Sequence, residues 1–306
     1  MRPAHRLPIK PLLLVLGLAA TAYAVALAVF GESTPIGTVQ RLWSWVGLQA
    51  ALLCLLNYFL RGLRWRLWMA QHQRPLGLIE GLRLYLAGYT FTPTPGNIGE
   101  AARGMLLARN PLNAAQSLAI FGAERLADLF CLLLMCLPLV GWLLTHVESG
   151  SATTLVIAFG LVALAVLVLL IKFHGLLLSR FLWLHEAWRC LATRPLVWLG
   201  LTAVAWAAQG LAVWLLCRDA GLAIEPLHAA AVYAVAMVGG ALSMLPAGMG
   251  GTEVLLATLL VAHGASAAVA LSITVLVRVV TLWLAVAIGA LALVYSAAIR
   301  HEITFR

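Results

Sequence analysis

Five stretches of the sequence carry no charged residue over about the length of a membrane-crossing helix. Each is close to the ~20 apolar residues that span the roughly 30 Å hydrocarbon core of a bilayer. They occupy residues 12–30, 42–60, 152–171, 196–217 and 279–299. The composition agrees, because 63% of the 306 residues are hydrophobic and 10% are charged, against roughly 25% charged in an average soluble domain. We therefore predict an all-α polytopic membrane protein with a single transmembrane domain over residues 1–306.

Basic residues predict the orientation of these spans. The net charge of +9 suits a membrane protein that collects Lys and Arg on its cytoplasmic side. The sequence has no soluble module in which basic and aromatic residues alternate, which argues against nucleic acid as a partner. The first run is longer than a typical signal-peptide core, so we expect an uncleaved span. The second run is followed by an arginine cluster that we place in the cytoplasm with both termini: Arg61, Arg64, Arg66 and Arg74. A headgroup-binding role for Arg64-Trp65-Arg66 is an alternative to anchoring.

A pattern of rare residues occurs twice, 153 positions apart. Pro93 is followed by Glu100 and Arg125, and the same spacings recur in Pro246, Glu253 and Arg278. We interpret this as a duplicated unit made of a span, a broken hairpin and a long helix. Repeat 1 covers residues 41–145, residues 146–194 supply a connecting span and an interfacial helix, and repeat 2 covers residues 195–299. Because the connecting span changes the side from which the second unit starts, we predict inverted structural repeats.

The hairpins are predicted from short apolar arms. Within residues 76–109 the arms have only about 17 and 12 residues, which is brief for a span and favours a re-entrant hairpin. Proline and glycine free backbone groups at the bends, which hydrocarbon tolerates only where protein or water satisfies them. The bend residues are Pro93, Pro95, Gly96 and Gly99, then Pro246, Gly248, Gly250 and Gly251. The count is six full spans plus two hairpins, or about eight spans if the arms cross.

Charged residues in the repeats are the candidate substrate-binding groups. Glu124, Arg125 and Asp128 share one face of a long helix predicted over residues 114–145. A charge at mid-membrane costs at least ~2.5 to 3.5 kcal/mol, so such residues face a partner or a wet cavity. With Glu100, Glu253 and Arg278 they form a set of six. One interpretation is structural, with Arg125 paired to Glu100 and Arg278 to Glu253 simply to hold each hairpin. The additional acids of the first copy favour a functional interpretation.

Catalytic and metal-binding patterns are missing from the sequence. It contains no His-Glu-x-x-His, Cys-x-x-Cys or Gly-x-Ser-x-Gly motif and no Gly-rich phosphate loop with lysine. Its eight histidines show no metal-ligand spacing, and its five cysteines are scattered and suit small core residues. We predict no enzymatic activity, no metal and no cofactor, and the sequence carries no signal for an oligomeric state.

Several short motifs occur together and in order. They are Arg61-Gly-Leu-Arg-Trp-Arg66, Pro95-Gly-x-x-Gly-Glu100 with Arg103, Glu124-Arg125-x-x-Asp128, and Pro246-x-Gly-x-Gly-Gly-x-Glu253 with Arg278. Over nearly its whole length the chain resembles the lysylphosphatidylglycerol synthase transmembrane family of flippase-like proteins. The resemblance implies a lipid translocase of the bacterial inner membrane with re-entrant hairpins, and it adds Arg103 to the substrate-binding residues.

The best known members of that family move aminoacylated phosphatidylglycerol from the inner to the outer leaflet. No soluble aminoacyl transferase domain follows Arg306, so we expect the chain not to make lysyl lipid and to have a separate lipid-synthesising enzyme as a partner. Polyprenyl-linked sugars and hopanoids are alternative substrates. We expect Arg125 and Arg278 to bind a lipid phosphate. An ion-coupled transporter of a small polar solute and a lipid-modifying membrane enzyme are the other functions that fit these residues.

Overall fold

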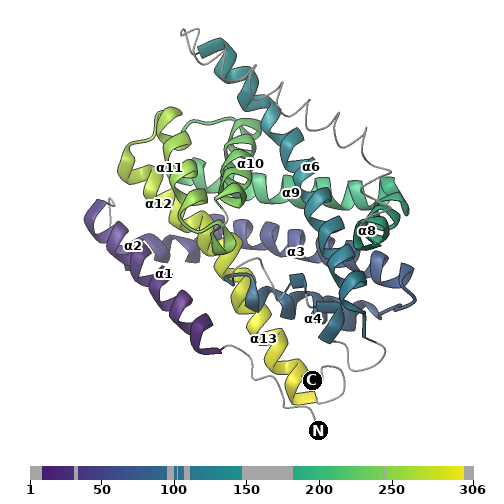
Figure 1. Ribbon diagram of the computed structural model, residues 1–306. Coiled ribbons are helices and arrows are strands. Elements are labelled where there is room, and N and C mark those ends of the chain that lie inside the picture. The colour runs from purple at the N-terminus through teal and green to yellow at the C-terminus, as the bar shows by residue number, and fades with distance from the viewer. Residues whose placement is uncertain are drawn as a thin grey trace.

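The computed structural model describes residues 9–30, 34–94, 100–101, 103–106, 111–146, 182–243 and 245–299, and within these ranges every regular element is helical. This confirms the all-α prediction (Figure 1). The α-helices are α1 (Ile9–Phe30), α2 (Pro35–Gln40), α3 (Trp45–Gln71), α4 (Leu78–Ala87), α6 (Ala114–His146), α8 (Leu182–Ala192), α9 (Pro195–Asp219), α10 (Pro226–Leu242), α11 (Gly251–Ala262), α12 (Ala267–Arg278) and α13 (Leu284–Ile299).

Three helices in the described ranges are long and apolar enough to cross a bilayer. They are α3, α9 and the continuous helix that runs from α12 into α13. The predicted span over residues 152–171 lies outside the described residues. Helix starts follow simple capping chemistry, as the Ser44 side chain accepts a hydrogen bond from the Gly47 N–H at the start of α3, and Pro195 and Pro226 occupy the first turns of α9 and α10.

The end of α3 differs from the prediction. The arginine cluster was expected to follow a span that ends near residue 60, yet α3 continues to Gln71 and carries Arg61 and Arg64 inside the protein. At 1.5 Å per residue its 27 residues are about 40 Å long. The two arginines lie in the interior, where carboxylates of α6 neutralise them.

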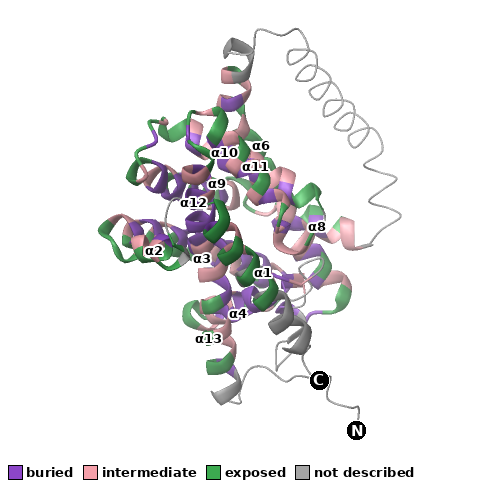
Figure 2. Cartoon of the chain, turned by 90° about the vertical axis from the view of Figure 1, so that its left-hand side faces the viewer, coloured by how far each residue is buried: buried purple, intermediate pink, exposed green. Residues whose placement is uncertain are grey.

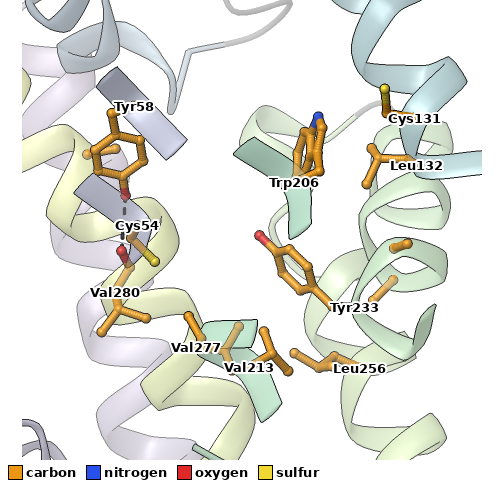
Figure 3. Close-up of a cluster of buried hydrophobic side chains, with 14 of the residues drawn as sticks. Cys54, Tyr58, Cys131, Leu132, Trp206, Val213, Tyr233, Leu256, Val277 and Val280 are labelled. Carbon is orange, nitrogen blue, oxygen red and sulfur yellow. Dashed lines mark hydrogen bonds between the residues drawn. The ribbon is translucent and has the colours of Figure 1, made fainter. Parts of the chain in front are cut away.

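The two predicted long helices are both present. α6 covers 33 residues, and α12 continues into α13 through a π-helical segment, η6 (Val279–Trp283). A π turn leaves carbonyl groups without their usual helical partners. The Tyr58 hydroxyl of α3 lies 3.0 Å from the Val280 carbonyl and 2.9 Å from that of Thr281, so this irregular turn is supported by a neighbouring helix (Figure 3).

The two predicted hairpin regions are described to different extents. In the second, α10 and α11 pack against each other after a bend that contains the short 3-10 helix η5 (Pro246–Gly248). Gly248 and Gly250 have φ values of 66° and 88°, a conformation that glycine adopts without a steric penalty. In the first, α4 is followed by the 3-10 helix η2 (Gly88–Phe91) and Pro93 is buried, whereas Pro95, Gly96 and Gly99 lie outside the described residues.

Helix packing brings distant parts of the chain together. α3 packs along α9, α6 along α10 and α8, and α13 against α4. Buried residues concentrate where these helices meet, and exposed residues lie on the outward sides (Figure 2). The core includes aromatic residues Tyr58, Trp206 and Tyr233 with aliphatic Val213 and Leu256 (Figure 3). All five cysteines are free, and four of them are buried, as expected of small core residues.

The outward faces are apolar. On α3, large exposed side chains include Leu52, Leu55, Leu56 and Phe59. Contiguous apolar surface of this kind is unusual on a water-soluble monomer and suits contact with lipid tails. The short helix α8 matches the predicted interfacial helix over residues 181–190 within one or two residues at each end.

Candidate functional site: a buried ion network and a smaller ion pair

Asp128 is the centre of a set of charged residues that lies between α3 and α6. Its carboxylate accepts hydrogen bonds from the guanidinium groups of Arg61 at 2.6 Å and Arg64 at 2.7 Å. The indole N–H of Trp206 donates to the same carboxylate at 3.2 Å. The spacing of Arg61 and Arg64 places both on one face of α3, so one carboxylate of α6 meets two arginines of α3.

Glu124 and Glu100 bind a third arginine. The Arg103 guanidinium lies 3.2 Å from Glu124 and 3.0 Å from Glu100. The rings of Tyr85 and Tyr89 stand 4.2 Å and 5.3 Å from that guanidinium and offer it π-electron density. Arg103 is therefore held between carboxylates and aromatic rings in the interior.

Arg125 is the most exposed of the arginines in this set. Its guanidinium donates to Glu100 at 2.9 Å and lies 3.6 Å from Asp128. Its side chain is 36% exposed, whereas Arg64 and Arg103 are at most 1% exposed. The prediction that its helix face looks into the protein is thus correct for Glu124 and Asp128, while Arg125 stands at the margin of the buried region.

We call these seven residues the ion network: Arg61, Arg64, Glu100, Arg103, Glu124, Arg125 and Asp128. Four arginines and three carboxylates leave one excess positive charge. In the described part of the chain, the buried Nε–H groups of Arg61, Arg64, Arg103 and Arg125 make no hydrogen bond. Unsatisfied buried donors cost free energy, so both the charge and the free donors of the network suit an anionic ligand.

A smaller ion pair occupies the corresponding place in the second half of the chain. Arg278 donates to Glu253 at 2.7 Å and to the Ala247 carbonyl at 2.9 Å. Glu253 also accepts hydrogen bonds from the Gly250 N–H at 2.7 Å and from the Tyr23 hydroxyl at 2.5 Å. One arginine and one glutamate balance each other, so this pair is neutral. The Glu253 carboxylate accepts hydrogen bonds from all three of these donors.

The bend explains why this pair forms. Gly250 lets the chain turn so that its own N–H meets Glu253 one helical turn later. A side chain at Gly251 would come within 3.0 Å of Ser243, so the glycines allow α10 and α11 to approach closely. The carbonyl of Ala247, which the bend turns away from regular helix, is free to accept from Arg278.

The structure therefore brings together all seven of the predicted substrate-binding residues in two groups. The sequence-based reasoning missed the roles of Arg61 and Arg64 inside the network, and of Tyr23 at the smaller pair. A signal existed for the arginines, because their i,i+3 spacing on a helix matches the spacing of Arg125 and Asp128. No sequence signal links Tyr23 to a glutamate 230 positions away.

A cysteine and a histidine also meet, outside the membrane-spanning helices. Cys190 of α8 lies 3.4 Å from His72, which caps the end of α3. Burial raises the pKa of the Cys190 thiol to about 12 and lowers the pKa of His72 below its usual 6.5. The pair is therefore a neutral thiol and a neutral imidazole at neutral pH, the opposite of an activated nucleophile. Among the described residues no three His, Cys, Asp or Glu side chains cluster as metal ligands.

Comparison with known proteins identifies the family of the chain. A family model described as the lysylphosphatidylglycerol synthase TM region matches residues 13–289. This range includes every residue of the ion network and of the Glu253–Arg278 pair. None of the curated proteins compared with the chain matches it.

Proposed function

Because the chain belongs to the lysylphosphatidylglycerol synthase TM region family, we propose that it is a multi-pass lipid translocase rather than an enzyme. Its substrate is a lipid whose headgroup contains phosphate, carried between the leaflets of the bacterial inner membrane. Aminoacylated and polyprenyl-linked lipids are the two candidate classes. A separate lipid-synthesising enzyme supplies the substrate, and both termini of the chain lie in the cytoplasm.

The ion network is the observation that carries this proposal. It has one excess positive charge, buried N–H donors without acceptors, and one arginine at its margin, Arg125. Guanidinium groups bind phosphate oxygens in a two-pronged manner that lysine does not match. A phosphate that arrives beside Arg125 would balance the charge of the network, while the carboxylates hold the remaining arginines in place.

We further propose that residues 41–145 and 195–299 are inverted repeats with re-entrant hairpins. The helices α3, α4 and α6 recur in order as α9, α10 and the helix from α12 to α13. The long helix of each half packs on the hairpin helix of the other, α6 on α10 and α13 on α4, and the equivalent helices α3 and α9 pack together. A two-fold relation between the halves would produce such reciprocal contacts.

The two halves differ in charge, and we infer that they have different roles. Position by position, Val277 and Thr281 stand where the first half has Glu124 and Asp128. The neutral and fully hydrogen-bonded Glu253–Arg278 pair holds its hairpin in place, whereas the ion network discriminates between headgroups. The phosphate site is therefore assigned to the first half, around Arg125.

Reconstitution of the full chain into liposomes tests the function. Fluorescent phosphatidylglycerol, its aminoacylated form and a phosphate-free glucosyl-diacylglycerol are each followed with a membrane-impermeant quencher. The proposal expects protein-dependent movement of the two phosphate lipids and little of the neutral glycolipid. Equal movement of all three lipids, solute uptake that ignores lipid identity, or a covalently altered lipid would each contradict it, the last two in favour of a transporter or an enzyme.

A further inference from the structure

One contact of the ion network comes from the other half of the chain. Trp206 lies on α9, whereas Asp128, to which its indole N–H donates at 3.2 Å, lies on α6. The Trp206 side chain is buried, and its ring stands beside that of Tyr233 with centroids 6.4 Å apart (Figure 3). A buried indole N–H usually finds a partner, and here the partner is the carboxylate at the centre of the network.

The two oxygens of the Asp128 carboxylate have different neighbours. Oδ1 accepts hydrogen bonds from Arg64 at 2.7 Å and from Trp206 at 3.2 Å. Oδ2 accepts from Arg61 at 2.6 Å and lies 3.6 Å from the guanidinium of Arg125. The last distance is too long for a good hydrogen bond. Arg125 is therefore the most weakly held of the three arginines around this carboxylate.

α9 also contacts the two arginines that Asp128 binds most closely. The Arg61 guanidinium lies 5.4 Å from the centroid of the Trp206 ring, within the range of a cation–π contact. One turn earlier on α9, the Thr202 hydroxyl accepts a hydrogen bond from Arg64 at 2.8 Å. These contacts keep the Asp128 carboxylate turned toward the arginines of α3.

A similar contact occurs at the corresponding position of the second long helix. Thr281 follows Asp128 by 153 positions, the offset of the repeated pattern. The Tyr58 hydroxyl of α3 donates to the Thr281 carbonyl at 2.9 Å. In each half, an aromatic donor from the span of the other half thus reaches this position. The acceptor in the first half is a carboxylate, so there the contact between the halves acts directly on a charged group.

We propose that Trp206 is a positioning residue for the lipid phosphate, an inference that rests on the translocase function proposed above. Its N–H and its ring hold Asp128 toward Arg61 and Arg64. Asp128 then does not draw in Arg125, whose guanidinium stays available to phosphate oxygens. A shift of α9 relative to α6 withdraws the indole donor, and Asp128 pairs more closely with Arg125. Movement of the two halves is thereby coupled to release of the headgroup.

Movement of fluorescent phosphatidylglycerol in liposomes, measured over a range of lipid mole fractions, tests this role. Trp206→Phe keeps an aromatic ring and removes the N–H. Trp214→Phe is the matched control, because Trp214 lies two turns further along α9 and its indole donates to the Ile224 carbonyl at 3.1 Å. We expect Trp206→Phe to raise the apparent KM about three- to tenfold, a coupling typical of residues in one network, with the maximal rate unchanged. Trp214→Phe should change neither. A purely structural role would lower the maximal rate and leave the KM as it is.

A double variant tests whether Trp206 acts through Arg125. In an Arg125→Gln background, Trp206→Phe should no longer change the KM. An equal rise of the KM in both backgrounds, or a rise in Trp214→Phe, overturns the positioning role.

Unfolding by SDS in mixed micelles measures the same coupling without any transport. Arg125→Gln should lower the folding equilibrium constant about threefold more in the Trp206→Phe background than in the unaltered chain, because Asp128 then holds Arg125 more closely. Strictly additive effects in this cycle overturn the positioning role. Liposomes in which the unaltered chain moves no phosphatidylglycerol contradict the proposed function instead, so the two failures are distinguishable.

Discussion

Replacing Asp128 with asparagine is the most severe test of how the ion network is held together. The substitution keeps the size of the side chain and removes its charge. Arg61 then loses the carboxylate at 2.6 Å and Arg64 the one at 2.7 Å. Arg64 keeps a more distant contact with Glu124 at 3.7 Å, but Arg61 has no second carboxylate within salt-bridge distance among the described residues.

The expected cost follows from that geometry. Breaking a buried ion pair by removing one partner costs about 3–5 kcal/mol, because a buried charge remains without compensation. An exposed pair contributes only about 0–1 kcal/mol. The Arg41–Asp219 pair is such a control, with side chains that are 34% and 28% exposed and a similar distance of 2.9 Å. Asp128→Asn should therefore destabilise the protein several times more than Asp219→Asn.

The assay is the free energy of unfolding in mixed micelles, titrated with SDS and followed by tryptophan fluorescence. A double variant, Asp128→Asn with Arg61→Gln, adds a second check. Removing both charges should destabilise the protein less than the sum of the two single variants, since each single variant leaves a charge that the double variant does not. A loss below about 1 kcal/mol for Asp128→Asn, or strict additivity in the double variant, would refute the reasoning.

Three further predictions concern other parts of the fold. Gly289→Ala should cost at least about 1–3 kcal/mol, because the new Cβ would lie 2.7 Å from backbone atoms of α4 and η2, whereas Gly200→Ala, with open space around it, should cost nothing in the same titration. Tyr23→Phe should cost about 1.5 kcal/mol or more by removing a hydrogen bond to a carboxylate; a loss no larger than in the exposed Tyr295→Phe would contradict that bond. The lowered pKa of His72 means that the unfolded chain binds its proton first, so stability should fall as the pH drops below about 6.5. His72→Gln should flatten that dependence, and an unchanged slope in this variant would contradict the prediction.

Much of the helical framework could be predicted, because its signals are local. Apolar runs mark α9 and most of α3, and a run beyond Arg278 marks α13. The matched spacing of Glu100 to Arg125 and of Glu253 to Arg278 indicated two equivalent pairs, and the structure places their charged groups 2.9 Å and 2.7 Å apart. A charge in an apolar run is costly enough that it needs a partner. The few charged residues inside the apolar runs therefore predict which side chains pair.

The burial of Arg61 and Arg64 along α3 was not predicted, for a physical reason. Arginines after an apolar run usually mark a cytoplasmic boundary, and the partners that keep Arg61 and Arg64 inside lie more than sixty positions later in the chain. A local pattern contains no information about such a long-range pairing. The same holds for the π turn after Arg278, whose support comes from the Tyr58 hydroxyl of another helix.

The role of Arg125 at the margin of the ion network is the central claim, and lipid movement in Arg125 variants tests it most directly. Arg125→Gln should slow the movement of fluorescent phosphatidylglycerol in liposomes by about 10- to 100-fold, equivalent to the ~1.5–3 kcal/mol of one charged hydrogen bond. Arg125→Lys should restore part of the rate, because it keeps the charge and loses the two-pronged geometry. The exposed Arg41→Gln should match the unaltered protein. Unchanged movement in Arg125→Gln, or equal slowing of a phosphate-free glycolipid, would contradict the account.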